Sequence, residues 1–265
     1  MKGIALGCLF LILSIALGAD FLAPHDPWKR FDPLLPPGSQ HPLGTNDLGY
    51  DIFSELLYGS RVTLLVGFGA AVVAGLVGVS FGLMAGVFGG VVDEFTMGLS
   101  DIVLLIPRIP LLLTLAAFYR PSFWGILLVL GMLGWPGTAR VVRSRTLQLR
   151  TSGFVQVNRC LGMSPLQIAF SDLLPNLSPV VLPQFLLTAS SAMIGEASLS
   201  FLGLGDPSVK SWGTIVGWAF TRGGFINERW WWFLPPLGGI LLSIFSVTAL
   251  EYLAHRNQEE GFLEL

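Results

Sequence analysis

Three ionisable residues lie within otherwise apolar stretches of the chain, where a charge carries unusual chemical weight. They are Asp101, Arg108 and Glu196. On insertion scales a charged side chain at the middle of a membrane helix costs about 2.5 to 3.5 kcal/mol, so each should face protein, water or another charge. For Arg108 two hypotheses stay open: it faces a watery cavity and attracts a carboxylate, or it pairs with Glu196 or with a carbonyl of another subunit and holds helices together.

The other reactive residue types do not form a recognisable catalytic set. There is no Gly-x-Ser-x-Gly, no His-Glu-x-x-His and no plausible Ser/His/Asp combination. The segment from Gly205 to Ser211 resembles part of a phosphate-binding loop, but no glycine precedes Lys210. The histidines and cysteines are scattered: His25, His41, His255, Cys8 and Cys160. The sequence therefore predicts no catalytic residue, no metal site and no cofactor bound by this chain.

Composition indicates which elements must position the charges. Of the 265 residues, 52% are hydrophobic and only 12% are charged, against about 25% charged in soluble domains. The net charge of -2 also excludes a basic nucleic-acid-binding surface. Between Arg61 and Asp93 no residue carries a formal charge, and about 20 apolar residues suffice to span a bilayer. An all-α integral membrane protein is predicted.

Six stretches are apolar enough to be membrane spans, and the third is the weakest because it contains Asp101 and Arg108. Their predicted ranges are 3–22, 62–90, 95–119, 122–140, 177–203 and 231–253. The first could be a cleaved signal peptide, but its long uncharged run favours a retained anchor. The predicted organisation is an N-terminal helix (1–22), an extracytoplasmic loop (23–61), a core (62–255) that contains a long segment (139–177), and a tail (256–265).

Arginine placement predicts the orientation. The segment 139–177 holds five arginines before its first acid, so the positive-inside rule places it in the cytoplasm. Six spans then put both termini in the cytoplasm, and the loops after spans 1 and 5 outside.

Glycines at intervals of four predict a close helix contact in span 2. Positions four apart share one helix face, and small residues let two backbones approach. The glycines expected to form this packing face are Gly78, Gly82, Gly86 and Gly90.

A short amphipathic helix is predicted within the segment 139–177. Phe154, Val157 and Leu161 recur at near-helical spacing, Gly162 is a plausible C-cap, and Ser164-Pro165 begins the next helix. A helix of this kind is suited to docking in a groove on a partner.

Three motifs resemble one family. Gly162, followed twelve and thirteen residues later by Leu174-Pro175, is similar to the coupling loop of ABC-importer permeases, although Gln156, Val157 and Asn158 replace the usual Glu-Ala-Ala. His41 to Asp51 and Gly195 to Gly205 resemble segments of the second permease subunit of dipeptide, oligopeptide and nickel importers, in which Arg more often stands at the position of Tyr50.

The resemblance implies a type I importer permease in a prokaryotic cell membrane, without enzymatic activity of its own. Its implied partners are a homologous second permease, two cytoplasmic ATPases that bind ATP and Mg²⁺, and an extracytoplasmic binding protein. The implied cargo is a di- or oligopeptide; a nickel or metal-chelate importer remains an alternative, as does an ion-coupled secondary transporter. Asp101, Arg108 and Glu196 become candidates for the translocation pathway. The implied ATPase contacts are Phe154, Gln156, Val157, Asn158, Arg159, Gly162, Met163, Ser164 and Pro175.

Overall fold

The computed structural model describes residues 2–118 and 122–263, and the elements in this part are helices apart from two isolated β-bridges. The helices before the long segment are α1 (Lys2–Leu17), α2 (Ala19–Leu22), α3 (Ile52–Phe88), α4 (Gly90–Leu105), α5 (Arg108–Phe118) and α6 (Phe123–Arg150). Those that follow are α7 (Gly153–Cys160), α8 (Pro165–Ile168), the π-helix η1 (Ala169–Leu173), α9 (Leu174–Asn176), α10 (Ser178–Phe201), α11 (Trp212–Thr221) and α12 (Trp230–Leu263). The all-α prediction is confirmed for these residues.

Among the described residues, five helical segments are long and apolar enough to cross a membrane: Gly3–Leu22, α3, α6, α10 and Trp230–Ala254. They include five of the six predicted spans. α3 begins at Ile52, before the predicted start at 62, and α6 continues to Arg150, beyond the predicted end at 140. Both predicted span limits were set at arginines, but the helices continue through these residues, and both arginines have partners within the chain. Arg61 binds Asp20 and the carbonyl of Ala16, and Arg140 binds Asp101.

The third predicted span, 95–119, is two helices rather than one. α4 ends at Leu105, Ile106 has an extended backbone, and α5 begins at Arg108. Pro107 explains the break, because a proline disfavours helical geometry at the preceding residue and has no N–H to donate. Residues 119–121, into which this span was predicted to run, and 264–265 of the predicted tail lie outside the described residues. The rest of that tail, from 256 to Leu263, continues α12.

The glycine face predicted in span 2 is confirmed for three of its four residues. A Cβ added to Gly78, Gly82 or Gly86 would stand 2.4 to 2.6 Å from atoms of α6, including the carbonyl oxygen of Ala139. Gly90 is different: it follows the end of α3, has φ +50 and would meet nothing within 4 Å, so it contributes to the turn into α4. These contacts make α3 and α6 a tightly packed helix pair.

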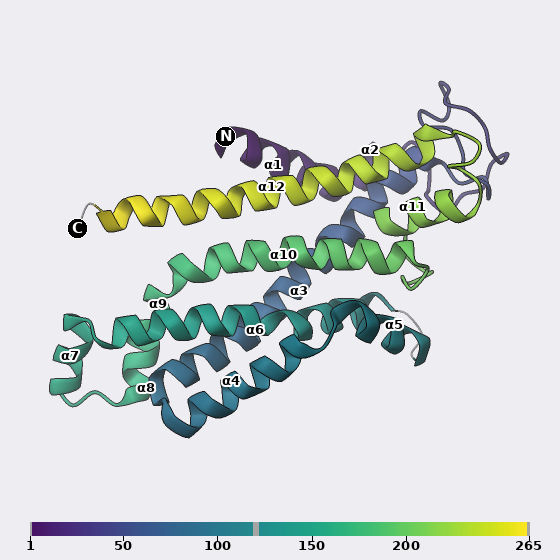
Figure 1. Cartoon of the computed structure of the whole chain (residues 1–265). Helices are drawn as coiled ribbons and strands as arrows, with labels where there is room; N and C mark the ends of the chain where they lie inside the picture. Colours follow the sequence, from purple (N-terminus) through teal and green to yellow (C-terminus); the bar gives the residue numbers. More distant parts are fainter. Residues whose placement is uncertain (1, 119–121, 264–265) are drawn as a thin grey trace.

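The chain has two distinct ends (Figure 1). The loop 23–51, α11 and the first residues of α3 and α12 lie together at one end, which we call the loop end. The helices α7 and α8 project at the opposite end, which we call the α7–α8 end. α3 crosses obliquely behind α6, α10 and α12 and connects the two. The sequence-based grouping of the loops after spans 1 and 5 on one side is therefore reproduced.

Candidate functional site

Local sequence signals define both helices of the α7–α8 end. α7 ends at Cys160, and Gly162 follows with φ +84. Its N–H donates to the Arg159 carbonyl at 3.0 Å, and the N–H of Met163 donates to the Asn158 carbonyl at 3.2 Å, which is a Schellman motif. α8 starts with a capping box, in which Ser164 and Gln167 each bind the other's backbone N–H. The predicted C-cap and the predicted helix start are both confirmed.

α7 presents apolar side chains away from its own chain. Phe154, Val157 and Leu161 are 44%, 58% and 76% exposed, whereas Val155 is fully buried. Val155 packs in a core cluster with Leu83 of α3 and other residues of α6, η1 and the start of α10. One side of α7 is thus packed on the hydrophobic cluster of its own chain, and the other side leaves an apolar face uncovered. An exposed apolar face of this kind is typical of a surface that binds another molecule.

The remaining predicted docking residues are near this face but have different surroundings. The Asn158 amide donates to an Asp172 carboxylate oxygen at 2.7 Å, and the Gln156 amide donates to the Thr151 carbonyl at 3.0 Å. Both amides therefore hold the loop together. Met163 is half-buried against the core cluster. The exposed ones are Gln156, Arg159, Gly162, Ser164 and Pro175.

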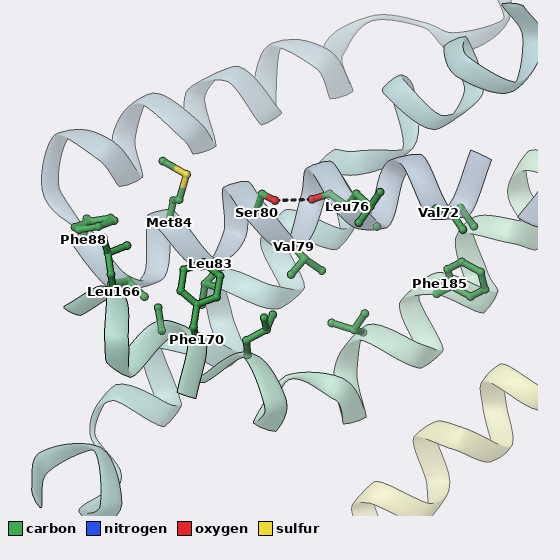
Figure 2. Close-up of a pocket in the computed structure, with 16 residues that line it drawn as sticks. Val72, Leu76, Val79, Ser80, Leu83, Met84, Phe88, Leu166, Phe170 and Phe185 are labelled. Atoms are coloured by element: carbon green, nitrogen blue, oxygen red, sulfur yellow. Dashed lines mark hydrogen bonds between the residues drawn. The ribbon is translucent and has the colours of Figure 1, made fainter. Parts of the chain in front are cut away.

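An apolar groove runs beside this end, between α3, α8, η1 and α10 (Figure 2). Its volume is about 820 Å³, and Phe88, Leu166 and Phe170 stand at one end while Phe185 stands at the other. The hydroxyl of Ser80 donates to the Leu76 carbonyl at 2.7 Å within α3, so this polar group needs no further partner. A groove of this character suits a hydrocarbon environment.

Two ion pairs between α4 and α6 account for four charged residues in or next to the predicted spans. Asp101 binds Arg140, and Asp93 binds Arg143 through two hydrogen bonds. Asp101 therefore has a partner, although its side chain stays 60% exposed. These two pairs fix α4 along α6.

Glu196 and Arg108 are not brought together. Glu196 is 2% exposed and accepts hydrogen bonds from Ser200 at 2.7 Å and Thr63 at 3.3 Å. Arg108 is exposed at the start of α5, and none of its contacts in the described chain links it to Glu196. The hypothesis of an Arg108–Glu196 pair is therefore wrong for this chain. Glu196 instead joins α10 to α3, and Arg108 is the predicted pathway residue that remains exposed without such a bond.

A buried charged network at the loop end was not predicted. Lys210 is 3% exposed, binds Glu55 of α3, and its ammonium lies 3.4 Å from the centre of the Tyr50 ring and 4.3 Å from that of Trp28. Glu55 also accepts from the Asn46 amide at 3.0 Å. Burial lowers the pKa of Lys210 below its usual range, and the facing carboxylate opposes part of that shift. The only sequence signal was a lysine in a loop otherwise rich in small residues.

The loop end, the five candidate spans and the exposed helix pair together describe a helical chain that can cross a membrane several times and that has an exposed apolar face on α7. Residues 78–257 match the family described as "Binding-protein-dependent transport system inner membrane component", and the chain belongs to that family.

Curated relatives extend the match over nearly the whole chain. The dipeptide transport system permease protein DppC of Bacillus subtilis is 32% identical over 91% of this chain and 76% of its own length. The di/tripeptide permease DppC of Pseudomonas aeruginosa is 32% identical, over 94% of this chain and 85% of its own. The oligopeptide permease OppC of B. subtilis is 33% identical, over 90% and 78%. The predicted family is confirmed.

A solved structure supports the fold. A chain from the inward-facing MetNI methionine ABC transporter superposes with a TM-score of 0.57 at 20% identity, covering 76% of this chain and 96% of that one. The type I importer permease fold is thereby confirmed.

Proposed function

We propose that this chain is a permease subunit of an ATP-driven importer and that its cargo is short peptides. The observation that carries the proposal is the apolar face of α7, formed by Phe154, Val157 and Leu161 and held against the membrane core by Val155. A rigidly mounted apolar helix face is the kind of surface that docks in a groove on a partner. In this proposal the groove belongs to a cytoplasmic ATPase.

We infer six membrane crossings, with α4 and α5 together forming the third. Neither is long enough alone, at 16 and 11 residues. The break at Pro107 is compatible with a membrane position only where protein or a watery cavity satisfies the freed backbone groups. We propose that the α7–α8 end lies in the cytoplasm with both termini, because arginines concentrate along the last turns of α6 and on α7.

The proposed complex contains this permease, a homologous second permease, two ATPases and an extracytoplasmic substrate-binding protein. ATP and Mg²⁺ would be bound by the ATPases, and this chain would perform no covalent chemistry. ATP-driven closure of the ATPases would move α7, and α7 would transmit the movement through Val155 to α3 and α6. Such a cycle needs two packings of similar free energy, each favoured by a different ligand.

Peptide cargo is supported by the relatives named as dipeptide, di/tripeptide and oligopeptide permeases. Arg108 is the side chain that we propose for the pathway, because it is exposed and because Asp101 and Glu196 already have partners within the chain. A guanidinium in a cavity between two permeases would attract a peptide carboxylate.

The test is transport by the reconstituted complex. The chain is expressed with the products of its neighbouring genes, and uptake of a labelled dipeptide and of ⁶³Ni²⁺ into proteoliposomes containing ATP is measured. Peptide uptake that requires ATP supports the proposal. ATP-dependent nickel uptake without peptide uptake would show that the cargo is nickel rather than peptides. Transport by the isolated chain would overturn the importer assignment.

Arg108→Leu, with Arg108→Lys as the matched variant, tests the pathway role. The leucine variant should assemble normally and lose most peptide uptake, while the lysine variant keeps a substantial part because the charge remains. Unchanged uptake by Arg108→Leu would reject the role.

A further inference from the structure

Two histidines that are far apart in the sequence meet at the loop end. The ring centres of His25 and His41 are 4.9 Å apart, and Phe31 packs against both, at 4.7 and 4.6 Å. His41 and Asp51 are buried, and His25 is half-buried. One potential ligand atom from each of His25, His41 and Asp51 lies within 4.8 Å of the other two.

The surrounding hydrogen bonds determine which ring nitrogens carry protons. The Asp51 carboxylate accepts the N–H of Ser54 at 2.8 Å and its hydroxyl at 2.7 Å, so it acts as an ionised acceptor at the start of α3. His41 Nδ1 lies 2.8 Å from the other oxygen of Asp51 and must donate to it. His25 Nε2 lies 3.0 Å from the Gln40 carbonyl oxygen, which can only accept.

This arrangement leaves one lone pair on each neutral imidazole: Nε2 of His41 and Nδ1 of His25. Histidines that bind metals almost always donate their other ring N–H to a carboxylate or a backbone carbonyl, which fixes the tautomer and the ring orientation. Asp51 and the Gln40 carbonyl are in these two supporting positions. The site is further held by the N–H of His25, which donates to the Ser54 hydroxyl at 3.2 Å.

We propose that His25 and His41, oriented by Gln40 and Asp51, bind one divalent transition-metal ion of the Zn²⁺ class. Imidazole nitrogen is a preferred ligand of zinc, copper and nickel ions, and water would complete the coordination. His25 also lines an open polar pocket of about 410 Å³ together with Asp20 and Asp26, so one of the two ligands is next to solvent.

Such an ion would join the loop 23–51 to the first turn of α3, because Asp51 is also the N-cap of that helix. The proposal concerns an ion that stays in the chain, so it is independent of the cargo and of the ATPase contact.

Zn²⁺ titration of the purified full chain in nanodiscs tests the proposal, with a non-histidine affinity tag and a chromophoric chelator as competitor. We expect one Zn²⁺ per chain in the wild type and at least tenfold weaker binding in His25→Gln. His255→Gln is the matched control, because it removes the third histidine and should bind like the wild type. Equal affinity in wild type and His25→Gln, or no binding by the wild type, would overturn the site.

A Co²⁺ spectrum and a rescue variant separate ligand loss from misfolding. His25→Cys offers a thiolate at the same position, so Co²⁺ should bind and give a sulfur-to-metal charge-transfer band that is absent from the wild type. Zn²⁺ should also raise the thermal midpoint of the wild type and not that of His25→Gln. A His25→Cys chain that folds but shows no new band contradicts the proposal.

Discussion

The loop end and the α7–α8 end differ in where their side chains find their contacts. At the loop end one charged pair is buried and bound within the chain: Lys210 and Glu55 make their contact across 155 residues of sequence. At the α7–α8 end the polar bonds are local, as between Asn158 and Asp172, and apolar side chains stay exposed. The buried pair is complete within one chain, whereas the exposed apolar face of α7 has the form of a surface that another molecule completes.

The largest effect is expected when the buried pair at the loop end is broken. Glu55→Ala leaves the Lys210 ammonium in an apolar site without its carboxylate, and removing one member of a buried pair costs about 3–5 kcal/mol. The free energy of unfolding of the purified chain, measured by denaturant titration in detergent, should fall by that amount. A double variant, Glu55→Leu with Lys210→Met, should recover much of the loss because no charge is left buried.

Asp47→Ala is the matched control for this prediction. It removes the ion pair with Arg222, which also joins the loop 23–51 to α11 and its surroundings but is partly exposed, with side-chain exposures of 34% for Arg222 and 23% for Asp47. Exposed pairs contribute about 0–1 kcal/mol. Equal losses of unfolding free energy in Glu55→Ala and Asp47→Ala would show that the buried pair contributes no more to stability than the partly exposed pair.

The α3–α6 contact, which connects the two ends, should give the next largest effect. In Gly82→Ala the new Cβ would stand 2.4 Å from the carbonyl oxygen of Ala139, a backbone atom that cannot move alone. Overpacking of this kind costs about 1–3 kcal/mol, measured as the change in free energy of unfolding. Gly75→Ala, where nothing lies within 4 Å, should be neutral or stabilising. A stable Gly82→Ala chain would contradict the close contact.

The two ends also differ in how well their sequences predicted them. The glycine face and the α7–α8 turns depend on residues a few positions apart. The contact of α3 with α6 could therefore be predicted from the spacing of Gly78, Gly82 and Gly86, and the end of α7 and the start of α8 from Gly162 and Ser164. The Lys210 and Glu55 contact joins distant segments, which no local pattern encodes. The helices α3 and α6 extend beyond the predicted span limits at Arg61 and Arg140, and the partners of these arginines, Asp20 and Asp101, likewise come from other helices.

A smaller and pH-dependent effect is expected at the loop end from Asp206. Its carboxylate accepts the N–H of Phe123, at the start of α6, at 2.8 Å, and both the N–H and the hydroxyl of Ser208. Partial burial raises the pKa of Asp206, but these hydrogen bonds outweigh it and hold the pKa below the ordinary value of 3.8. Because the folded pKa is lowered, the stabilisation is present above pH 3.8 and is lost as the pH falls through the folded pKa.

Asp206→Asn should therefore lower the free energy of unfolding by about 1 kcal/mol at pH 7, and the difference from the wild type should shrink in acid below pH 3.8. Denaturant titrations of both chains at pH 7 and below pH 3.8 measure this difference in the free energy of unfolding. Asp26→Asn is the control, since Asp26 accepts the N–H of Trp28 within its own turn. A difference that stays constant with pH would rule out the carboxylate as the source.

The smallest effect on stability is expected at the exposed face of α7. Val157→Asp adds a charge to a side chain that is 58% exposed, so the free energy of unfolding should change by less than about 0.5 kcal/mol. Copurification of the ATPases with the chain should nevertheless fall at least tenfold, because the new carboxylate would be desolvated in an apolar groove.

Val155→Asp is the matched control, with the same residue types exchanged two positions earlier on the same helix. Val155 is fully buried, so the carboxylate there should destabilise the folded chain itself. We expect Val157→Asp to lose the ATPases at unchanged stability and Val155→Asp to lose stability. This result would show that one side of α7 binds the partner and the other side stabilises the fold. If Val157→Asp unfolds the chain, that side chain serves the fold; if the ATPases remain bound, their contact lies elsewhere, and in either case the α7–α8 end is not the surface that a partner completes.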